Sequence, residues 1–387
     1  MIIQREMNDS ILSTVDQFPV ITITGPRQSG KTTLVKSLFS DYEYYSMEDP
    51  DIREFALTDP RRFLNQKNSA IILDEVQRTP ELLSYIQGIV DRKPLSTRYI
   101  ITGSHQFELI HQISQSLAGR TIIFKLLPFT ISELKQFVPE QSLDKFLLQG
   151  FYPGVHDRRL NATLAYKNYF ETYIQKDLRE LIQIKNLRLF NKFVKLCAGR
   201  IGQIFSANSL SNEVGVSVPT IQSWISILEA SYIVFFLEPY YANIGKRLIK
   251  SPKIYFYDVG LASYLLGIET EIQMERDPLR GNLFENLVLM ELVKKRLNKG
   301  LNHNLYFYRD SNKNEVDIVY QSSGQLIPFE IKSSETFSKH FFKGLKYFQN
   351  LFPERVKKAY LVYTGNFEKE MNNFELIHFT KISQMID

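Results

Sequence analysis

The sequence predicts an α/β protein that begins with a parallel β-sheet covered by helices on both faces. Three observations support this prediction. The apolar run 20–24 is followed by a glycine-rich loop and a helical pattern, and the apolar run 70–75 ends in two acidic residues. The third is that strands alternate with helices, which is typical of a parallel sheet. The other elements expected here are strands at 42–46, 98–103 and 121–124 and helices at 51–67 and from Pro80.

The glycine-rich loop has the spacing G-x-x-x-x-G-K-T of a phosphate-binding P-loop. Its glycines let several backbone N–H groups point at one anion, beside the positive end of the next helix. We therefore expect a nucleoside triphosphate, ATP, with Lys31 on its β- and γ-phosphates and the Thr32 hydroxyl on Mg²⁺. The alternative is an ordinary glycine turn. The predicted nucleotide-binding residues are Gly25, Pro26, Arg27, Gln28, Ser29, Gly30, Lys31, Thr32 and Thr33.

The acidic pair after the second apolar run has the form of a Walker B segment. In this interpretation Asp74 holds Mg²⁺ through water, and Glu75 polarises the water that attacks the γ-phosphate. A buried strand that ends in Asp-Glu is common by itself. Together with the P-loop it predicts that the chain binds and hydrolyses ATP.

Composition limits the class of protein. A chain of 387 residues with 44% hydrophobic residues predicts two or three domains with sizeable cores. The net charge of +5 permits a nucleic-acid partner without requiring one. The single cysteine, Cys197, fits a reducing cytoplasm, and we expect it to be a packed core thiol. No stretch approaches the ~18 apolar residues that a membrane span needs, and the first residues lack the apolar core of a secretion signal.

The motifs also resemble those of one AAA-type ATPase family of bacteria and archaea. The matching stretches are the P-loop, Ile-Leu-Asp-Glu-Val-Gln-Arg-Thr-Pro-Glu-Leu at 72–82, Ile-Ile-Thr-Gly-Ser at 100–104 and Leu-Ala-Gly-Arg at 117–120. The similarity continues through 150–154, 252–260 and 281–285, and so covers nearly the whole chain. Members of this family usually carry a C-terminal domain of unknown function that is related to restriction-type nucleases.

The resemblance implies a sensor at the end of the strand next to Walker B. In AAA-type ATPases a polar residue there senses the γ-phosphate, and Ser104 occupies this position, with His105 and Gln106 as nearby substitutes. An ordinary serine in a turn is the alternative. Arg120, just before the strand 121–124, is a candidate to contact the γ-phosphate in cis or to act as an arginine finger in a neighbouring subunit. A structural ion pair explains Arg120 equally well.

The middle of the chain has a helix–turn–helix pattern at 206–229, followed by two strands at 232–238 and 253–257 that would form a wing. From 201 to 245 there is no lysine or arginine, so the second helix offers nothing to DNA phosphates. Only Lys246, Arg247 and Lys250 lie near the wing. We therefore favour a packing or dimerisation module over a DNA reader, and expect Trp224 to be core or interface.

The last third carries a second set of residues with catalytic character. Asp317 on one strand and Glu330-Ile-Lys332 on the next form the D…E-x-K pattern of restriction-type nucleases. Alternation along the strand puts Glu330 and Lys332 on one face. Asp317 and Glu330 would share a divalent cation, and Lys332 would position water or stabilise charge. The family resemblance adds Glu285, on the preceding helix, as a further metal ligand. The alternative is a nuclease-like fold that has lost cleavage and only binds or docks.

These observations predict three domains. They are an AAA-like ATPase at 1–150, a helical and winged-helix-like domain at 151–275, and an α/β restriction-nuclease-like domain at 276–387. We expect a cytoplasmic Mg²⁺-dependent ATPase that is coupled to a nucleic-acid transaction. The alternative is a regulatory ATPase switch whose inactive nuclease-like domain docks a protein partner. Homo-oligomers are compatible with both of these functions. The least favoured hypothesis is an autonomous winged-helix transcription regulator.

Overall fold

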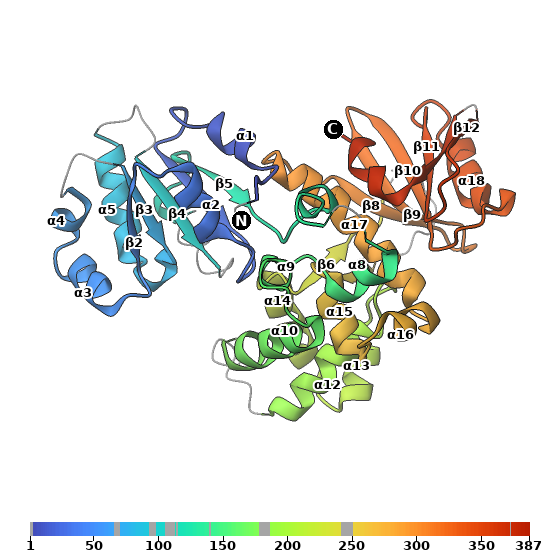
Figure 1. The fold of residues 1–387 in the computed structure, drawn as a ribbon, viewed down its shortest axis with the longest axis horizontal. Coiled ribbons are helices and arrows are strands. Elements are labelled where there is room, and N and C mark those ends of the chain that lie inside the picture. Colours follow the sequence, from blue (N-terminus) through green and yellow to red (C-terminus); the bar gives the residue numbers. More distant parts are fainter. Residues whose placement is uncertain are drawn as a thin grey trace. The chain divides into compact units, whose positions relative to one another are not determined.

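The chain forms two compact units in the computed structural model, which describes residues 3–387 except 66–69, 93–97, 105–112, 114, 139–140, 178–185, 241–250 and 372. Unit 1 consists of Met1–Phe129 and Arg296–Leu301, and unit 2 of Thr130–Lys295 and Asn302–Asp387 (Figure 1). The proposed three-domain division stays a prediction, because the middle and C-terminal parts share unit 2. Among the described helices, none is both long and apolar enough to cross a membrane.

Unit 1 is built on a five-stranded sheet with the order β2-β3-β4-β1-β5, in which every neighbouring pair is parallel. The sheet confirms the predicted fold class, and the strand bounds agree with the expected runs to within a residue or two. Because all strands run the same way, their carboxyl ends meet at one edge. The strands are β1 (Val20–Thr24), β2 (Glu43–Ser46), β3 (Ile71–Asp74), β4 (Tyr99–Gly103) and β5 (Thr121–Lys125).

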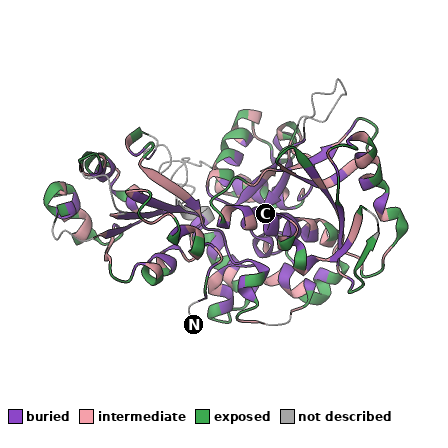
Figure 2. Cartoon of the chain, turned by 90° about the horizontal axis from the view of Figure 1, so that it is seen from above, coloured by how far each residue is buried: buried purple, intermediate pink, exposed green. Residues whose placement is uncertain are grey.

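Helices cover both faces of this sheet because successive side chains of each strand point to opposite faces. On one face Ile21 and Ile23 pack with α1 and α2, and on the other Val20 packs with α3, α4 and α5. The inner strands β1, β3 and β4 are buried and the edge strands β2 and β5 are mostly half-buried, while the outer sides of the helices are exposed (Figure 2). The helices are α1 (Asn8–Leu12), α2 (Lys31–Leu38), α3 (Pro50–Thr58), α4 (Pro60–Asn65) and α5 (Glu81–Val90), with a 3-10 turn at Val76–Arg78.

The first part of unit 2 is helical and contains the predicted helix–turn–helix order. α13 and α14 are joined at Gly215, whose φ of +87° ends α13, and the antiparallel pair β6 and β7 follows. Trp224 of α14 packs against Phe190 and Phe193, and Cys197 is buried, so both are core residues as expected. Residues 241–250, which include the basic residues near the wing, lie outside the described part.

The elements of this helical part are α7 (Ile131–Leu134), α8 (Leu143–Gln149), α9 (Pro153–Asp157), α10 (Ala162–Tyr169), π-helical turns at Phe170–Asp177, α12 (Leu187–Ala198), α13 (Ala207–Val214), α14 (Val218–Ala230), β6 (Val234–Leu237), β7 (Lys253–Phe256), α15 (Val259–Leu266) and α16 (Glu271–Arg276).

The second part of unit 2 is a six-stranded mixed sheet with the order β12-β13-β11-β10-β9-β8. β9 and β10 form an antiparallel hairpin whose turn, Ser323-Gly324, has positive φ at both residues, as two-residue hairpins prefer. α18 packs on one face of the sheet. The elements are α17 (Arg280–Asn298), β8 (Leu305–Arg309), β9 (Glu315–Ser322), β10 (Gln325–Lys332), α18 (Lys343–Leu351), β11 (Ala359–Tyr363), β12 (Lys369–Met371) and β13 (Phe374–His378), with 3-10 turns at Lys339–Phe342 and Phe379–Gln384.

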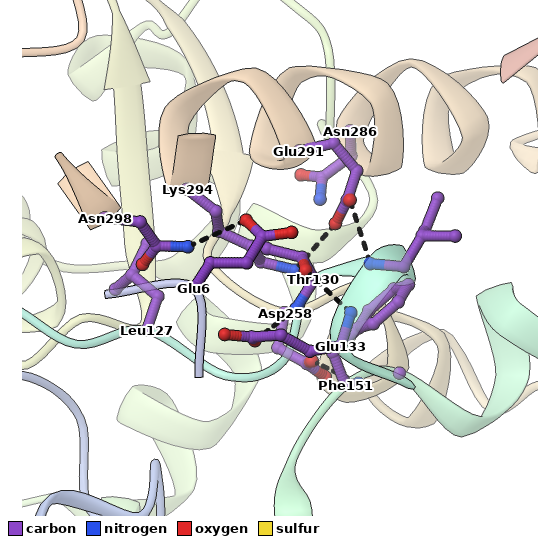
Figure 3. A network of polar contacts seen from close by, with 12 residues as sticks. Glu6, Leu127, Thr130, Glu133, Phe151, Asp258, Asn286, Glu291, Lys294 and Asn298 are labelled. Atoms are coloured by element: carbon purple, nitrogen blue, oxygen red, sulfur yellow. Dashed lines mark hydrogen bonds and ion pairs between the residues drawn. The ribbon is translucent and has the colours of Figure 1, made fainter. Parts of the chain in front are cut away.

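α17 contributes residues to both units. Within unit 2, the Glu291 carboxylate accepts hydrogen bonds from the backbone N–H of Ile131 at 2.9 Å and from Lys294 at 3.1 Å (Figure 3). Within unit 1, the side chain of Asn298 donates to Glu6 at 3.3 Å. Because Ile131 is the first residue of α7, Glu291 supplies a partner for a backbone N–H that has none within its own helix.

Candidate functional site

The carboxyl edge of the sheet in unit 1 gathers the predicted nucleotide-binding and catalytic residues. The P-loop follows β1, Asp74 ends β3, Glu75 comes next, and Ser104 follows β4. The strand order places β1 and β3 on either side of β4, so these ends are close neighbours. In open α/β sheets this edge is where ligands bind.

The P-loop has the backbone that its glycines predict. Gly25 has a φ of +146°, and a Cβ atom there would lie 2.1 Å from the carbonyl oxygen of Leu126. Gly30 has a φ of +94° and is the N-cap of α2. Both values are in the range that favours glycine. The loop therefore leads directly into the amino end of α2, where unpaired N–H groups and the helix dipole favour an anion.

Lys31 lies inside this loop. Its ammonium group donates to the carbonyl oxygens of Gly25 at 3.0 Å and Pro26 at 2.9 Å. Burial lowers the pKa of Lys31 to about 8, although Glu75 and Asp74 oppose the shift. A buried ammonium group without a full counter-charge is suited to receive phosphate oxygens.

Asp74 is held by hydroxyl groups from three other elements. Thr32 donates to its Oδ2 at 2.9 Å, Tyr44 donates to the same oxygen at 2.6 Å, and the Thr102 hydroxyl donates to Oδ1. The Thr32 hydroxyl and the carboxylate are thus adjacent, as a shared Mg²⁺ requires. Sequence reasoning missed Tyr44 and Thr102, which lie on the two strands that neighbour β3 in the sheet.

Glu75 is the first residue after β3 and adopts the left-handed conformation, with a φ of +57°. Its Oε2 accepts a hydrogen bond from Ser104 at 2.8 Å and another from the side chain of Gln77. Burial by itself would raise the pKa of Glu75. The charge of Lys31 and these hydrogen bonds outweigh burial and leave the pKa below its usual value. The carboxylate is therefore ionised at neutral pH, as a general base must be.

Two arginines lie in or against the P-loop. Arg27, in the P-loop, is near enough for its positive charge to lower the pKa values of Lys31 and Glu75. Arg5 was not expected from the sequence. Its buried guanidinium donates to the carbonyls of Ser29 at 2.9 Å and Leu127 at 2.6 Å, and so fastens the P-loop to the segment after β5.

Arg120 is not part of this arrangement. It precedes β5, which pairs in parallel with β1 in the register Val20↔Thr121, so it lies at the opposite edge of the sheet. A five-residue strand of roughly 16 Å separates the two edges, which contradicts a contact in cis. Its guanidinium instead makes a two-point ion pair with Asp91, with Nη2 3.0 Å from Oδ2. A role in trans stays a prediction. His105 and Gln106 lie outside the described residues.

The residues predicted for the C-terminal site are brought together within unit 2. Glu330 and Lys332 share one face of β10, with Lys332 Nζ 2.6 Å from Glu330 Oε1 and 3.8 Å from Asp317 Oδ2. Asp317 also accepts from the backbone N–H of Ile331 at 2.7 Å. Burial, together with the negative charge of Asp317, raises the pKa of Glu330 to about 8.

Glu285 contacts side chains of β7, a strand that the sequence did not connect with it. Lys253 of β7 lies 3.2 Å from Glu285 Oε1 and 2.6 Å from Glu315 Oε1. The Tyr255 hydroxyl also donates to Glu285. In the part of the chain that the structure describes, no three His, Cys, Asp or Glu side chains are grouped so as to hold a metal ion.

Family models match three consecutive parts of the chain. Residues 17–135 match a model described as an AAA domain. Residues 140–272 and 280–383 match two models described as domains of unknown function, DUF8612 and DUF4143.

Curated relatives match over most of the chain. The chain is 32% identical over 341 residues to uncharacterized protein Rv2008c of Mycobacterium tuberculosis, covering 87% of this chain and 75% of the relative. The same figures hold for uncharacterized protein Mb2031c of Mycobacterium bovis. Uncharacterized protein MJ1544 of Methanocaldococcus jannaschii is 24% identical over 350 residues, covering 81% of this chain and 75% of the relative.

Solved structures are similar at a lower level. The Walker-type ATPase PABY2304 of Pyrococcus abyssi has a TM-score of 0.45 and 14% identity, covering 68% of this chain and 96% of that one. The RuvB Holliday junction branch migration motor of Thermotoga maritima has a TM-score of 0.32 and 17% identity, covering 60% and 89%.

Proposed function

The chain belongs to a family of AAA-domain proteins that includes its two mycobacterial relatives, and on this basis we propose that it binds ATP with Mg²⁺ and hydrolyses ATP. The observation that carries the proposal is the arrangement at the carboxyl edge of the unit 1 sheet. There the Thr32 hydroxyl lies 2.9 Å from Asp74 Oδ2, beside the buried Lys31.

The residues have separate roles in this proposal. The backbone of the P-loop and Lys31 bind the phosphates, while Thr32 and Asp74 hold Mg²⁺, which would neutralise charge on the β- and γ-phosphates. Glu75 takes up the proton of the attacking water. Ser104, which donates to Glu75 Oε2, positions that carboxylate and senses the γ-phosphate through it.

We further propose that hydrolysis is coupled to a nucleic-acid transaction in the cytoplasm. Support comes from the C-terminal sheet, where Asp317, Glu330 and Lys332 lie together as the D…E-x-K pattern requires. Cleavage by this site predicts Mg²⁺-dependent nicking of DNA that is lost in Lys332→Ala and retained in Lys31→Ala.

The experiment is ATP turnover with Mg²⁺ by the full chain, without DNA and with duplex or single-stranded DNA. Lys31→Ala should abolish turnover, whereas Lys167→Ala, a change on the exposed side of α10, should not. Stimulation by DNA in the wild type and in Lys167→Ala supports the coupling. Absence of turnover in the wild type contradicts the ATPase proposal.

A second candidate function is a regulatory ATPase switch whose C-terminal domain docks a protein partner. The observation that favours it is the presence of the lysine side chains of Lys253 and Lys332 among the carboxylates of the C-terminal site. The absence of lysine and arginine from 201 to 245 also disfavours DNA reading by the helix–turn–helix. Turnover that does not respond to any DNA would favour this candidate. A homo-oligomer in which Arg120 acts in trans is compatible with both candidates.

A further inference from the structure

Lys253 is a buried cation that comes from one matched region and meets carboxylates of the next. It lies on β7, within the region that matches DUF8612, and its side chain is only 3% exposed. Glu285 and Glu315 belong to the region that matches DUF4143. A buried ammonium group is tolerated only when carboxylates and hydrogen bonds replace its water. Ion pairs with these two acids therefore stabilise Lys253 in its buried position.

The backbone around Lys253 is held in place by the same helix. The side chain of Asn286, one residue after Glu285 on α17, accepts from the N–H of Phe256 at 2.7 Å and donates to its carbonyl at 3.0 Å. One turn earlier, Asn282 donates to the carbonyl of Ile201 at 3.0 Å. Because residues spaced by three and four lie on one helical face, α17 presents Asn282, Glu285 and Asn286 together, and β7 is docked on that face.

The charges leave little need for a divalent cation. Lys253 balances Glu285, Lys253 and Arg309 balance Glu315, and Lys332 lies between Asp317 and Glu330. One oxygen of this set, Glu330 Oε2, is buried without a hydrogen-bond partner among the described residues. Mg²⁺ prefers six oxygen ligands, one or two of them from carboxylates. In this arrangement at least one oxygen of each of these four acids is already paired with an ammonium or guanidinium group. A metal ion bound between the acids would have to displace a lysine, so the residues as arranged do not fit the metal.

We propose that Lys253 is the built-in cation of the C-terminal acidic site. Its ammonium group takes the place of a divalent metal ion beside Glu285 and Glu315. The site therefore binds no metal while β7 is docked on α17, which favours the protein-docking switch over the Mg²⁺-dependent nicking considered above. This inference concerns unit 2 alone and does not depend on ATP hydrolysis.

The test compares Lys253→Met with the wild type, with Lys357→Met and with the double variant Lys253→Met/Glu285→Gln. Methionine keeps most of the side-chain volume and removes the charge. Lys357 is the control because its side chain is 64% exposed and its ion pair with Glu354 is long, at 3.9 Å, so loss of its charge should change stability little. Each nucleotide-free protein is melted in EDTA and in Mn²⁺, and bound Mn²⁺ is measured by its electron paramagnetic resonance signal. Mn²⁺ held at the P-loop is common to all four proteins.

Lys253→Met should melt at a lower temperature in EDTA, because Glu285 and Glu315 lose their counter-charge. Mn²⁺ should raise its melting temperature, and its Mn²⁺ affinity should exceed that of the wild type by about tenfold or more. The double variant should regain part of the lost melting temperature and lose the response to Mn²⁺. The wild type and Lys357→Met should show neither effect.

Three results would overturn the proposal. One is a Lys253→Met variant as stable as the wild type in EDTA and indifferent to Mn²⁺. Another is Mn²⁺ binding by the wild type that Glu285→Gln removes. If Lys253→Met does not fold, the double variant decides: a folded double variant supports the charge balance, and an unfolded one contradicts it.

Discussion

At the scale of single residues, the ATP site of unit 1 depends on the side chains that hold its acids as well as on the acids themselves. Asp74 accepts from Thr32, Tyr44 and Thr102, and Glu75 accepts from Ser104. Such supporting groups orient a metal ligand or a base before the substrate arrives. They come from α2, from β2 and from β4 with the residue that follows it, so the geometry of the site depends on how these elements pack in unit 1.

Tyr44→Phe tests this dependence. The change removes one donor from Asp74 Oδ2 and leaves the ring in place. We expect Mg²⁺-dependent turnover to fall by about tenfold, with half-saturation at higher Mg²⁺, because supporting partners of a metal ligand typically contribute 10- to 100-fold. ATP binding measured in EDTA should not change. Tyr45→Phe on the same strand loses a bond to Glu43 instead and serves as the control. Equal effects of the two changes would contradict the role of Tyr44.

At the scale of elements, the strand–loop–helix of the P-loop is the part most completely determined by local sequence. Gly25 and Gly30 provide backbone conformations that other residues rarely adopt, and the apolar run before them forms a buried strand. The same holds for the β9–β10 hairpin with its turn at Gly324. Local rules suffice for such elements because the interactions that form them lie within a few residues.

Gly25→Ala should strongly destabilise unit 1. A Cβ atom at Gly25 meets the carbonyl oxygen of Leu126 at 2.1 Å, and the positive φ is strained for alanine. We expect a cost of about 1–3 kcal/mol or more. The control is Gly88→Ala in α5, where nothing lies within 4 Å of the added carbon, and where alanine should stabilise by up to about 1 kcal/mol. The measurement is the free energy of unfolding in urea. A Gly25→Ala variant as stable as Gly88→Ala would contradict this geometry.

Contacts between distant segments are what the sequence could not predict. Arg5 reaches the P-loop across 24 residues, and Lys253 reaches Glu285 across 32. No spacing rule connects such pairs, because they depend on how whole elements pack. Arg120 shows the same limit. Its sequence position beside a strand was clear, but only the parallel register of β1 and β5 places it at the edge away from the P-loop.

At the scale of the whole molecule, the middle and C-terminal parts form one compact unit, and unit 2 contains the only tryptophan of the chain, Trp224. Its fluorescence therefore reports the unfolding of unit 2 directly. Within this unit His156 is buried, and its Nε2 donates to the carbonyl of Gly150 at 2.9 Å. Burial lowers the pKa of His156, and Lys145 adds to this, against the opposing effects of Gly150 and Asp258.

The contribution of His156 to the stability of unit 2 should become less favourable as the pH falls. The pKa of His156 is lower in the folded than in the unfolded state, so below about pH 6.5 the unfolded chain binds more protons, which favours unfolding. Glu330 acts in the opposite direction, because folding raises its pKa to about 8. The prediction therefore concerns the difference between two proteins, the wild type and His156→Gln, which keeps a donor for Gly150. We expect the free energy of unfolding of the wild type relative to His156→Gln, followed by Trp224 fluorescence, to decrease from neutral pH towards pH ~5.5. Identical slopes for the two proteins would assign the pH dependence to other groups.

The most direct test of the central claim, that this chain hydrolyses ATP with Glu75 as base, is single-turnover hydrolysis of bound ATP by Glu75→Gln. Glu81→Gln, a change in the exposed first turn of α5, is the matched control. We predict that Glu75→Gln binds ATP with Mg²⁺ nearly as tightly as the wild type but hydrolyses it about 10²- to 10⁴-fold more slowly, while Glu81→Gln behaves as the wild type. Hydrolysis by Glu75→Gln at the wild-type rate would contradict the account.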